Sequence, residues 1–78
     1  RETMQRAMRD RLLRPDQVAT RLNVSTRSVY RIIEEGHVRA LRVRGSLRVL
    51  ESSVDEYLAR QLAEFELEIG FPANYAND

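Results

Sequence analysis

The side chains best suited to recognition chemistry lie in one short segment, residues 24–33. Hydroxyl and guanidinium groups occur there at positions that a helix would turn outward: Ser25, Thr26, Arg27, Ser28, Tyr30 and Arg31. Such groups match phosphate oxygens and the edges of DNA bases. We therefore expect these six residues to contact DNA. The alternatives are an exposed helix face with solvated arginines, and a Tyr30 ring that packs between this helix and a following hairpin.

The pattern of the same segment predicts a short helix. Ser25 can accept a hydrogen bond from a free backbone N–H of the first turn. Val29, Ile32 and Ile33 recur at helical spacing, so we expect them to face a core. Gly36 is expected to end the helix.

A second short helix is predicted just before this one. Pro15 suits the first position of a helix, and an apolar stripe follows it: Val18, Ala19 and Leu22. Asn23 can leave the helix in a left-handed conformation. Two short helices joined so tightly predict a helix-turn-helix. We expect residues 1–13 to form a loose helix or a basic arm.

A β-hairpin is predicted after the two helices. Apolar residues and arginines mix over 38–43 and 47–50, and Arg44-Gly45-Ser46 supplies turn chemistry. The candidate DNA contacts here are Arg42, Arg44, Gly45, Ser46 and Arg48. Because Arg42, Arg44 and Arg48 have even spacing, we expect one face of the hairpin to present all three. The alternative is a hairpin that its charges merely keep soluble.

The C-terminal third is expected to hold a helix and then an extended tail. Ser53 and Glu56 have capping-box spacing, with Ser52 as an alternative cap, and apolar residues follow at helical period to Phe65. We expect this helix to cover the core. Residues 64–71 alternate apolar and acidic side chains, which predicts a strand. The candidate protein contacts in this tail are Glu66, Leu67, Glu68, Ile69 and Phe71. They suit either a neighbouring subunit or the chain's own core.

Charge and composition exclude several classes of function. Residues 1–48 hold twelve arginines and five acidic residues, a net +7, whereas 49–78 hold one arginine and seven acidic residues, a net −6. This asymmetry indicates a nucleic-acid surface and an acidic tail. With no cysteine and one histidine, we expect no metal and no cofactor. No apolar run is long enough for a membrane span. Glu34-Glu35 has no nucleophile nearby, so we expect no enzyme.

The residues described above resemble a known family over about residues 12 to 62. The matching elements are Leu13 to Ala19, Leu22 to Ser25, Val29 to Ile33, Gly36, the hairpin, and Val54 to Leu58. They resemble the small winged helix-turn-helix of phage excisionases, in particular those of actinobacterial phages. That fold is related to the DNA-binding domains of MerR-like regulators.

The resemblance implies an α+β winged helix-turn-helix whose helix at 25–35 enters the major groove, while the wing at 42–48 reaches the minor groove. It implies a non-catalytic protein of the bacterial host cytoplasm, associated with the nucleoid. Such proteins bend double-stranded DNA at phage attachment sites, assemble head to tail with adjacent copies, and direct an integrase, a tyrosine recombinase, towards excision. This sequence departs from the pattern at Arg14, where a hydroxyl cap is usual, and at Leu47 and Arg48, where the wing often carries an aromatic residue.

Three regions and two alternatives follow from the sequence. We predict a basic arm or helix over 1–13, the winged helix-turn-helix over 14–65, and an acidic extended tail over 66–78. One alternative is the DNA-binding domain of a MerR-like transcription regulator. That family dimerises through a long coiled coil, and these 78 residues contain no heptad repeat of that length. The other is a protein-interaction adaptor that does not bind DNA.

Overall fold

Local capping interactions set the limits of the first helix. The computed structural model describes residues 9–69, and in it helix α2 spans Pro15–Leu22. Arg14 has no acceptor to cap this helix; instead, Gln17 Oε1 accepts a hydrogen bond of 2.8 Å from the Arg14 N–H. Asn23 follows the helix at φ 58°, and the Val24 N–H donates to the Ala19 carbonyl at 3.0 Å. The predicted left-handed exit at Asn23 is therefore confirmed.

Helix α3 spans Thr26–Glu34 and begins after a turn of only three residues. As predicted, Ser25 caps it, because the Ser25 Oγ accepts from the Ser28 N–H at 3.1 Å. Gly36, at φ 81°, ends it as predicted, and the His37 N–H donates to the Ile32 carbonyl at 3.1 Å. These bonds satisfy backbone groups that every helix end leaves free.

The sheet has three antiparallel strands in the order β1-β3-β2, namely β1 Leu12–Leu13, β2 Ala40–Val43 and β3 Ser46–Leu50. The predicted hairpin is β2–β3, with Arg44 and Gly45 both at positive φ in its two-residue turn, as a twisted hairpin requires. The expectation of a helix or arm up to residue 13 was wrong at Leu12 and Leu13, which form strand β1. Leu13 pairs with Val49 and is buried. A strand of two residues is too short to show the alternation of apolar and polar side chains by which a strand is predicted from sequence.

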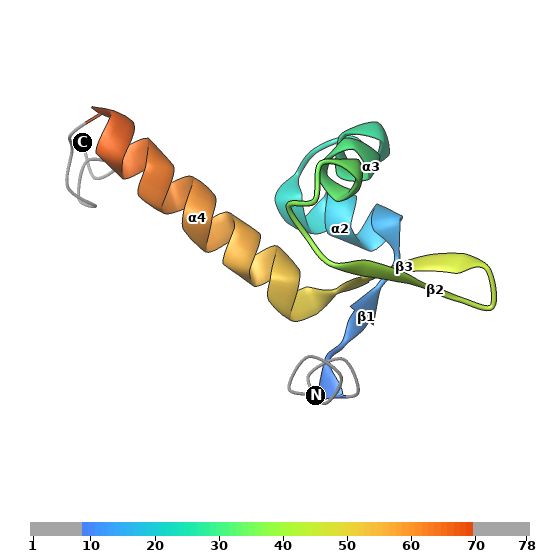
Figure 1. Cartoon of the computed structure of the whole chain (residues 1–78). Coiled ribbons are helices and arrows are strands. Elements are labelled where there is room, and N and C mark those ends of the chain that lie inside the picture. The colour runs from blue at the N-terminus through green and yellow to red at the C-terminus, as the bar shows by residue number, and fades with distance from the viewer. Residues whose placement is uncertain (1–8, 70–78) are drawn as a thin grey trace.

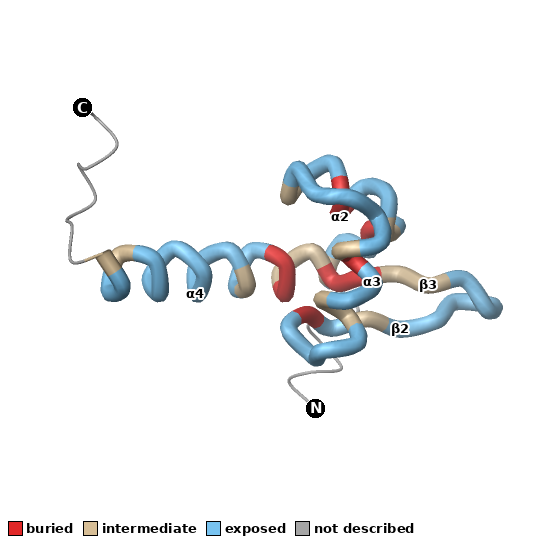
Figure 2. Tube along the Cα trace, turned by 90° about the horizontal axis from the view of Figure 1, so that it is seen from above, coloured by how far each residue is buried: buried red, intermediate tan, exposed pale blue. Residues whose placement is uncertain are grey.

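The core lies where α2 and α3 pack on the inner face of this sheet (Figure 1). One valine from each of four elements is almost fully buried: Val18, Val29, Val49 and Val54. Leu22, Ile32 and Ile33 pack around them, so the predicted stripes of both short helices are confirmed. Figure 2 shows the buried residues concentrated in this part of the molecule.

Helix α4 spans Glu51–Ile69 and corrects two expectations. It does not cover the core: Val54 is buried, but Leu58 and Leu62 are 42% and 59% exposed, and the helix leaves the body (Figures 1 and 2). The strand predicted over 64–71 was wrong for residues 64–69, which are helical, and so was the extended tail for residues 66–69. Glu and Leu favour helix, and lengthening an existing helix needs no new nucleus. Phe71 lies outside the described residues.

The start of α4 also differs from the prediction. The helix begins directly after β3, and Ser53 lies inside its first turn. The Ser53 Oγ donates to the Leu50 carbonyl at 2.7 Å and accepts from the Arg39 N–H at 3.0 Å. Asp10 takes the capping role, because its carboxylate accepts from the Ser52 N–H at 3.1 Å and also bonds the Ser52 hydroxyl.

Candidate nucleic-acid interface

The outward face of α3 presents the predicted cations. Arg27 and Arg31 are exposed and lie one turn apart, on the same side of the helix. Within residues 9–69 neither guanidinium forms an ion pair or a side-chain hydrogen bond. Tyr30 is 45% exposed beside them. The structure thus leaves two arginines and a phenol available to a ligand on one helix face.

Two of the predicted contact residues already have structural roles. The Ser25 Oγ caps α3 and also donates to the Ser28 Oγ at 3.1 Å. Ser28 is half-buried, whereas Thr26 is exposed in the first turn. That first turn contains no acidic residue. The positive end of the helix dipole therefore faces solvent without a compensating carboxylate, which favours an anion such as phosphate.

The hairpin does not present its three arginines on one face. In the register, Arg42 pairs with Leu47 and Arg48 pairs with Leu41. Paired residues share a face and successive residues alternate, so Arg42 and Arg48 lie on opposite faces. Even spacing predicts a shared face only within one strand, and the two-residue turn places Arg42 and Arg48 in different strands.

Arg42 and Arg44 form the wing tip. The face that carries Arg42 also carries Val49, which is buried beneath α2 and α3, so Arg42 lies on the side of the recognition helix. The Arg42 Nη1 donates to the Gly45 carbonyl at 2.9 Å, across the turn. Arg44 is exposed at φ 53° in the turn itself, with Gly45 and Ser46 exposed next to it.

The charge asymmetry persists in the fold. Residues 9–50 hold ten arginines and four acidic residues, a net +6, whereas α4 holds one arginine and six acidic residues, a net −5. Three of those four acids have local partners, since Asp10 caps α4, Asp16 pairs with Arg14 at 3.2 Å, and Glu35 lies 3.3 Å from His37 Nε2. The basic surface around α3 and the wing is therefore only weakly neutralised by its own domain.

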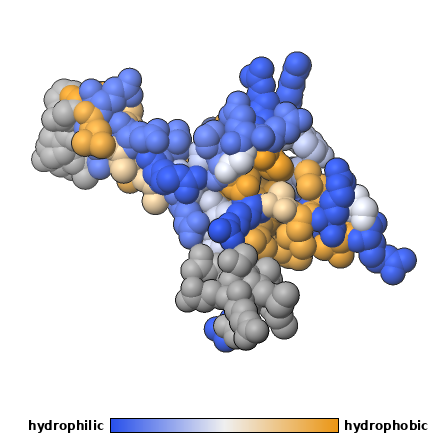
Figure 3. Space-filling view, viewed as in Figure 1, coloured by the Kyte–Doolittle hydropathy of each residue, from blue (hydrophilic) through white to orange (hydrophobic). Residues whose placement is uncertain are grey.

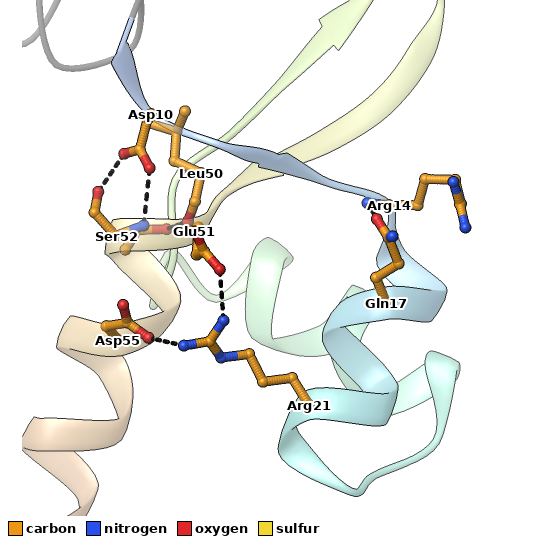
Figure 4. A network of polar contacts seen from close by, with 9 residues as sticks. Asp10, Arg14, Gln17, Arg21, Leu50, Glu51, Ser52 and Asp55 are labelled. Carbon is orange, nitrogen blue, oxygen red and sulfur yellow. Dashed lines mark hydrogen bonds and ion pairs between the residues drawn. The ribbon is translucent and has the colours of Figure 1, made fainter.

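Arg21 has a role that the sequence did not suggest. Its guanidinium bridges α2 to α4, with Nη1 2.7 Å from Glu51 Oε2 and Nη2 2.5 Å from Asp55 Oδ1 (Figure 4). A second contact holds α4, because Arg60 Nη2 donates to the His37 carbonyl at 2.7 Å. These contacts fix the direction in which α4 leaves the domain. Their partners are 23 to 34 residues apart, so no local signal marked them.

Over 9–69, no three His, Cys, Asp or Glu side chains gather closely enough to hold a metal ion. None of the helices in this range combines the length and the apolar character needed to span a membrane.

Helices α2 and α3 are joined by a three-residue turn and pack on a sheet whose hairpin projects beside α3. This arrangement defines a winged helix-turn-helix domain. The sequence model of the helix-turn-helix domain family matches residues 12–62, and the chain belongs to this family. Membership supports DNA as the partner. The matched range includes the wing and the first turns of α4 but not residues 63–69. No curated protein matches the chain significantly, and neither does any solved structure.

Proposed function

We propose that this protein is a non-catalytic, sequence-specific DNA-binding protein that grips the duplex at two places. Arg27 and Arg31, with Thr26 and Tyr30, enter the major groove, while Arg42 and Arg44 at the wing tip reach the adjacent minor groove. The observation that carries the proposal is that the exposed face of α3 and the Arg42 face of the wing lie on the same side of the sheet. A narrow minor groove attracts arginine strongly.

The finer role that we propose is that of an excisionase, which bends DNA at phage attachment sites and directs an integrase in the bacterial cytoplasm. Engaging two grooves at each of several neighbouring sites favours a bent path. A chain with a basic body and an acidic projecting helix suits assembly of adjacent copies head to tail. The short resemblance over 12–62 supports the same role.

One observation favours a second candidate, the DNA-binding domain of a MerR-like regulator. Leu58, Leu62, Phe65 and Ile69 follow the 4-3-4 spacing of a coiled-coil seam. This seam covers less than two heptads, whereas a sustained coiled coil needs about three or four. The excisionase is therefore the better supported hypothesis. The complete reading frame would discriminate further between the excisionase and the regulator.

Binding to a duplex with a single site, measured over a salt series, tests the DNA grip. Each lost phosphate contact should lower the slope of log K against log salt by about 0.9. Arg42→Ala/Arg44→Ala should therefore lower it by up to about 1.8. The matched control is Arg39→Ala, which removes the same type of charge from an exposed residue at the base of the hairpin. Equal slopes for the wing variant and the control would refute the wing half of the grip. No binding at low salt would refute the grip as a whole and favour the adaptor alternative.

Footprinting on attachment-site DNA, with and without integrase, tests the excisionase role. A phased row of protected sites and an enhanced integrase footprint are expected. A single isolated site that integrase does not affect would contradict this role and leave DNA binding intact.

A further inference from the structure

The projecting part of α4 exposes an apolar stripe. Leu58 and Leu62 are 42% and 59% exposed, and Phe65 is 47% exposed on the same side of the helix. Leu67, which is 84% exposed, lies on the opposite side. A row of large apolar side chains on a helix that leaves its own domain is a feature of interaction surfaces rather than of scattered surface residues.

The outer face of the sheet is a second exposed apolar surface. Leu12, Leu41 and Val43 are between 37% and 43% exposed, and the register places them on the face opposite the core. Arg48, which pairs with Leu41, lies among them. In Figure 3, hydrophobic side chains gather over the strands, below the hydrophilic α2–α3 pair. This outer face is therefore both apolar and basic.

The two surfaces match in character but cannot meet within one chain. Glu66 and Glu68 flank the α4 stripe on either side, which complements a basic partner. The Arg21 bridge and the Arg60 contact fix the base of α4, and the rest of the helix points away from the sheet (Figures 1 and 2). Pairing α4 with another α4 would bury a short seam and bring glutamates together.

We propose that the Leu58–Leu62 stripe of α4 docks on the outer sheet face of a second copy, around Leu41, Val43 and Arg48. This inference rests on the proposed function, because it names the surfaces through which adjacent copies assemble. The outer face lies opposite the side of the sheet that carries Arg42 and α3, so docking leaves the DNA grip accessible. Arg48 accordingly serves the protein contact rather than the DNA contact. Both patches are small, so the contact between free copies is expected to be weak. DNA that holds two copies side by side raises their effective concentration and so favours docking.

Disulfide trapping tests the docking, because the sequence contains no cysteine. Leu62→Cys in one copy and Val43→Cys in a second copy, one of them enlarged by a tag, are mixed and oxidised with and without a duplex holding two adjacent sites. The heterodimer is expected, and more of it on DNA. The matched control is Leu67→Cys with Val43→Cys, from the opposite face of α4, and it should give at least about fivefold less.

The outcomes separate this inference from the proposed function. Equal trapping through Leu67→Cys, no trapping in any mixture, or a dominant homodimer of Leu62→Cys, which would indicate α4–α4 pairing, each overturns the docking. A second measurement uses Leu62→Ser and Leu67→Ser: only the former should lower cooperativity between adjacent sites, by about fivefold, with single-site affinity unchanged. If single-site binding itself fails, the proposed function fails, while oxidation of concentrated protein without DNA still decides the docking.

Discussion

The Arg21 bridge gives the most direct test of how α4 is held. We consider Arg21→Met, which keeps a long aliphatic stem and a favourable helix propensity but removes the charge. The change breaks the contacts of 2.7 Å to Glu51 and 2.5 Å to Asp55. Because α2 and α4 are joined across these contacts, the variant should loosen the attachment of α4 without altering the exposed face of α3.

The expected magnitude follows from exposure. The side chains of Arg21, Glu51 and Asp55 are 39%, 27% and 55% exposed, so solvent screens both pairs. Exposed pairs contribute about 0.2–1 kcal/mol each, and the pair with Glu51 should lie near the upper end because it is less exposed. The two pairs together should contribute about 1 kcal/mol. For a domain of this size, that corresponds to a fall in Tm of roughly 4–8 °C.

Thermal unfolding followed by circular dichroism measures this loss. Double-mutant cycles of Arg21→Met with Glu51→Gln and with Asp55→Asn assign it to the two pairs. We expect the larger coupling energy with Glu51 and no change in affinity for a single DNA site. A Tm within about 1 °C of the original protein, or no coupling with either acid, would refute the bridge as an anchor of α4.

Three further changes test local features of the fold. Ser25→Ala removes the cap of α3 and should cost about 1 kcal/mol by urea denaturation, whereas Ser25→Asp should retain most of the stability; equal losses would contradict the capping role. Gly45→Ala should cost about 1 kcal/mol through its left-handed φ of 86° alone, since nothing lies within 4 Å of the added Cβ; an unchanged unfolding midpoint would argue against this turn. Asp10→Ala removes the α4 cap and should cost about 1 kcal/mol, with Asp10→Asn intermediate; hydrogen exchange at the Ser52 amide should rise in the former, and an unaltered rate would count against the cap.

The parts of the fold that depend on neighbouring residues were predictable from the sequence. Ser25 caps through a residue three positions away, Asn23 and Gly36 end their helices through backbone bonds within one turn, and the Arg44-Gly45 turn needs positive φ. The stripes of the two short helices follow from helical period alone. These local signals were sufficient for the helix-turn-helix and its hairpin, and hence for the candidate recognition helix.

The remaining features depend on contacts between residues distant in sequence. Strand β1 exists because Leu13 pairs with Val49, and Arg48 is separated from Arg42 by the pairing register. The direction of α4 depends on Arg21, which meets Glu51 and Asp55 across 30 and 34 residues. A sequence shows which side chains are present and how they repeat along the chain. Which face those side chains occupy, and which apolar side chains stay exposed, is decided only when strands pair and helices pack.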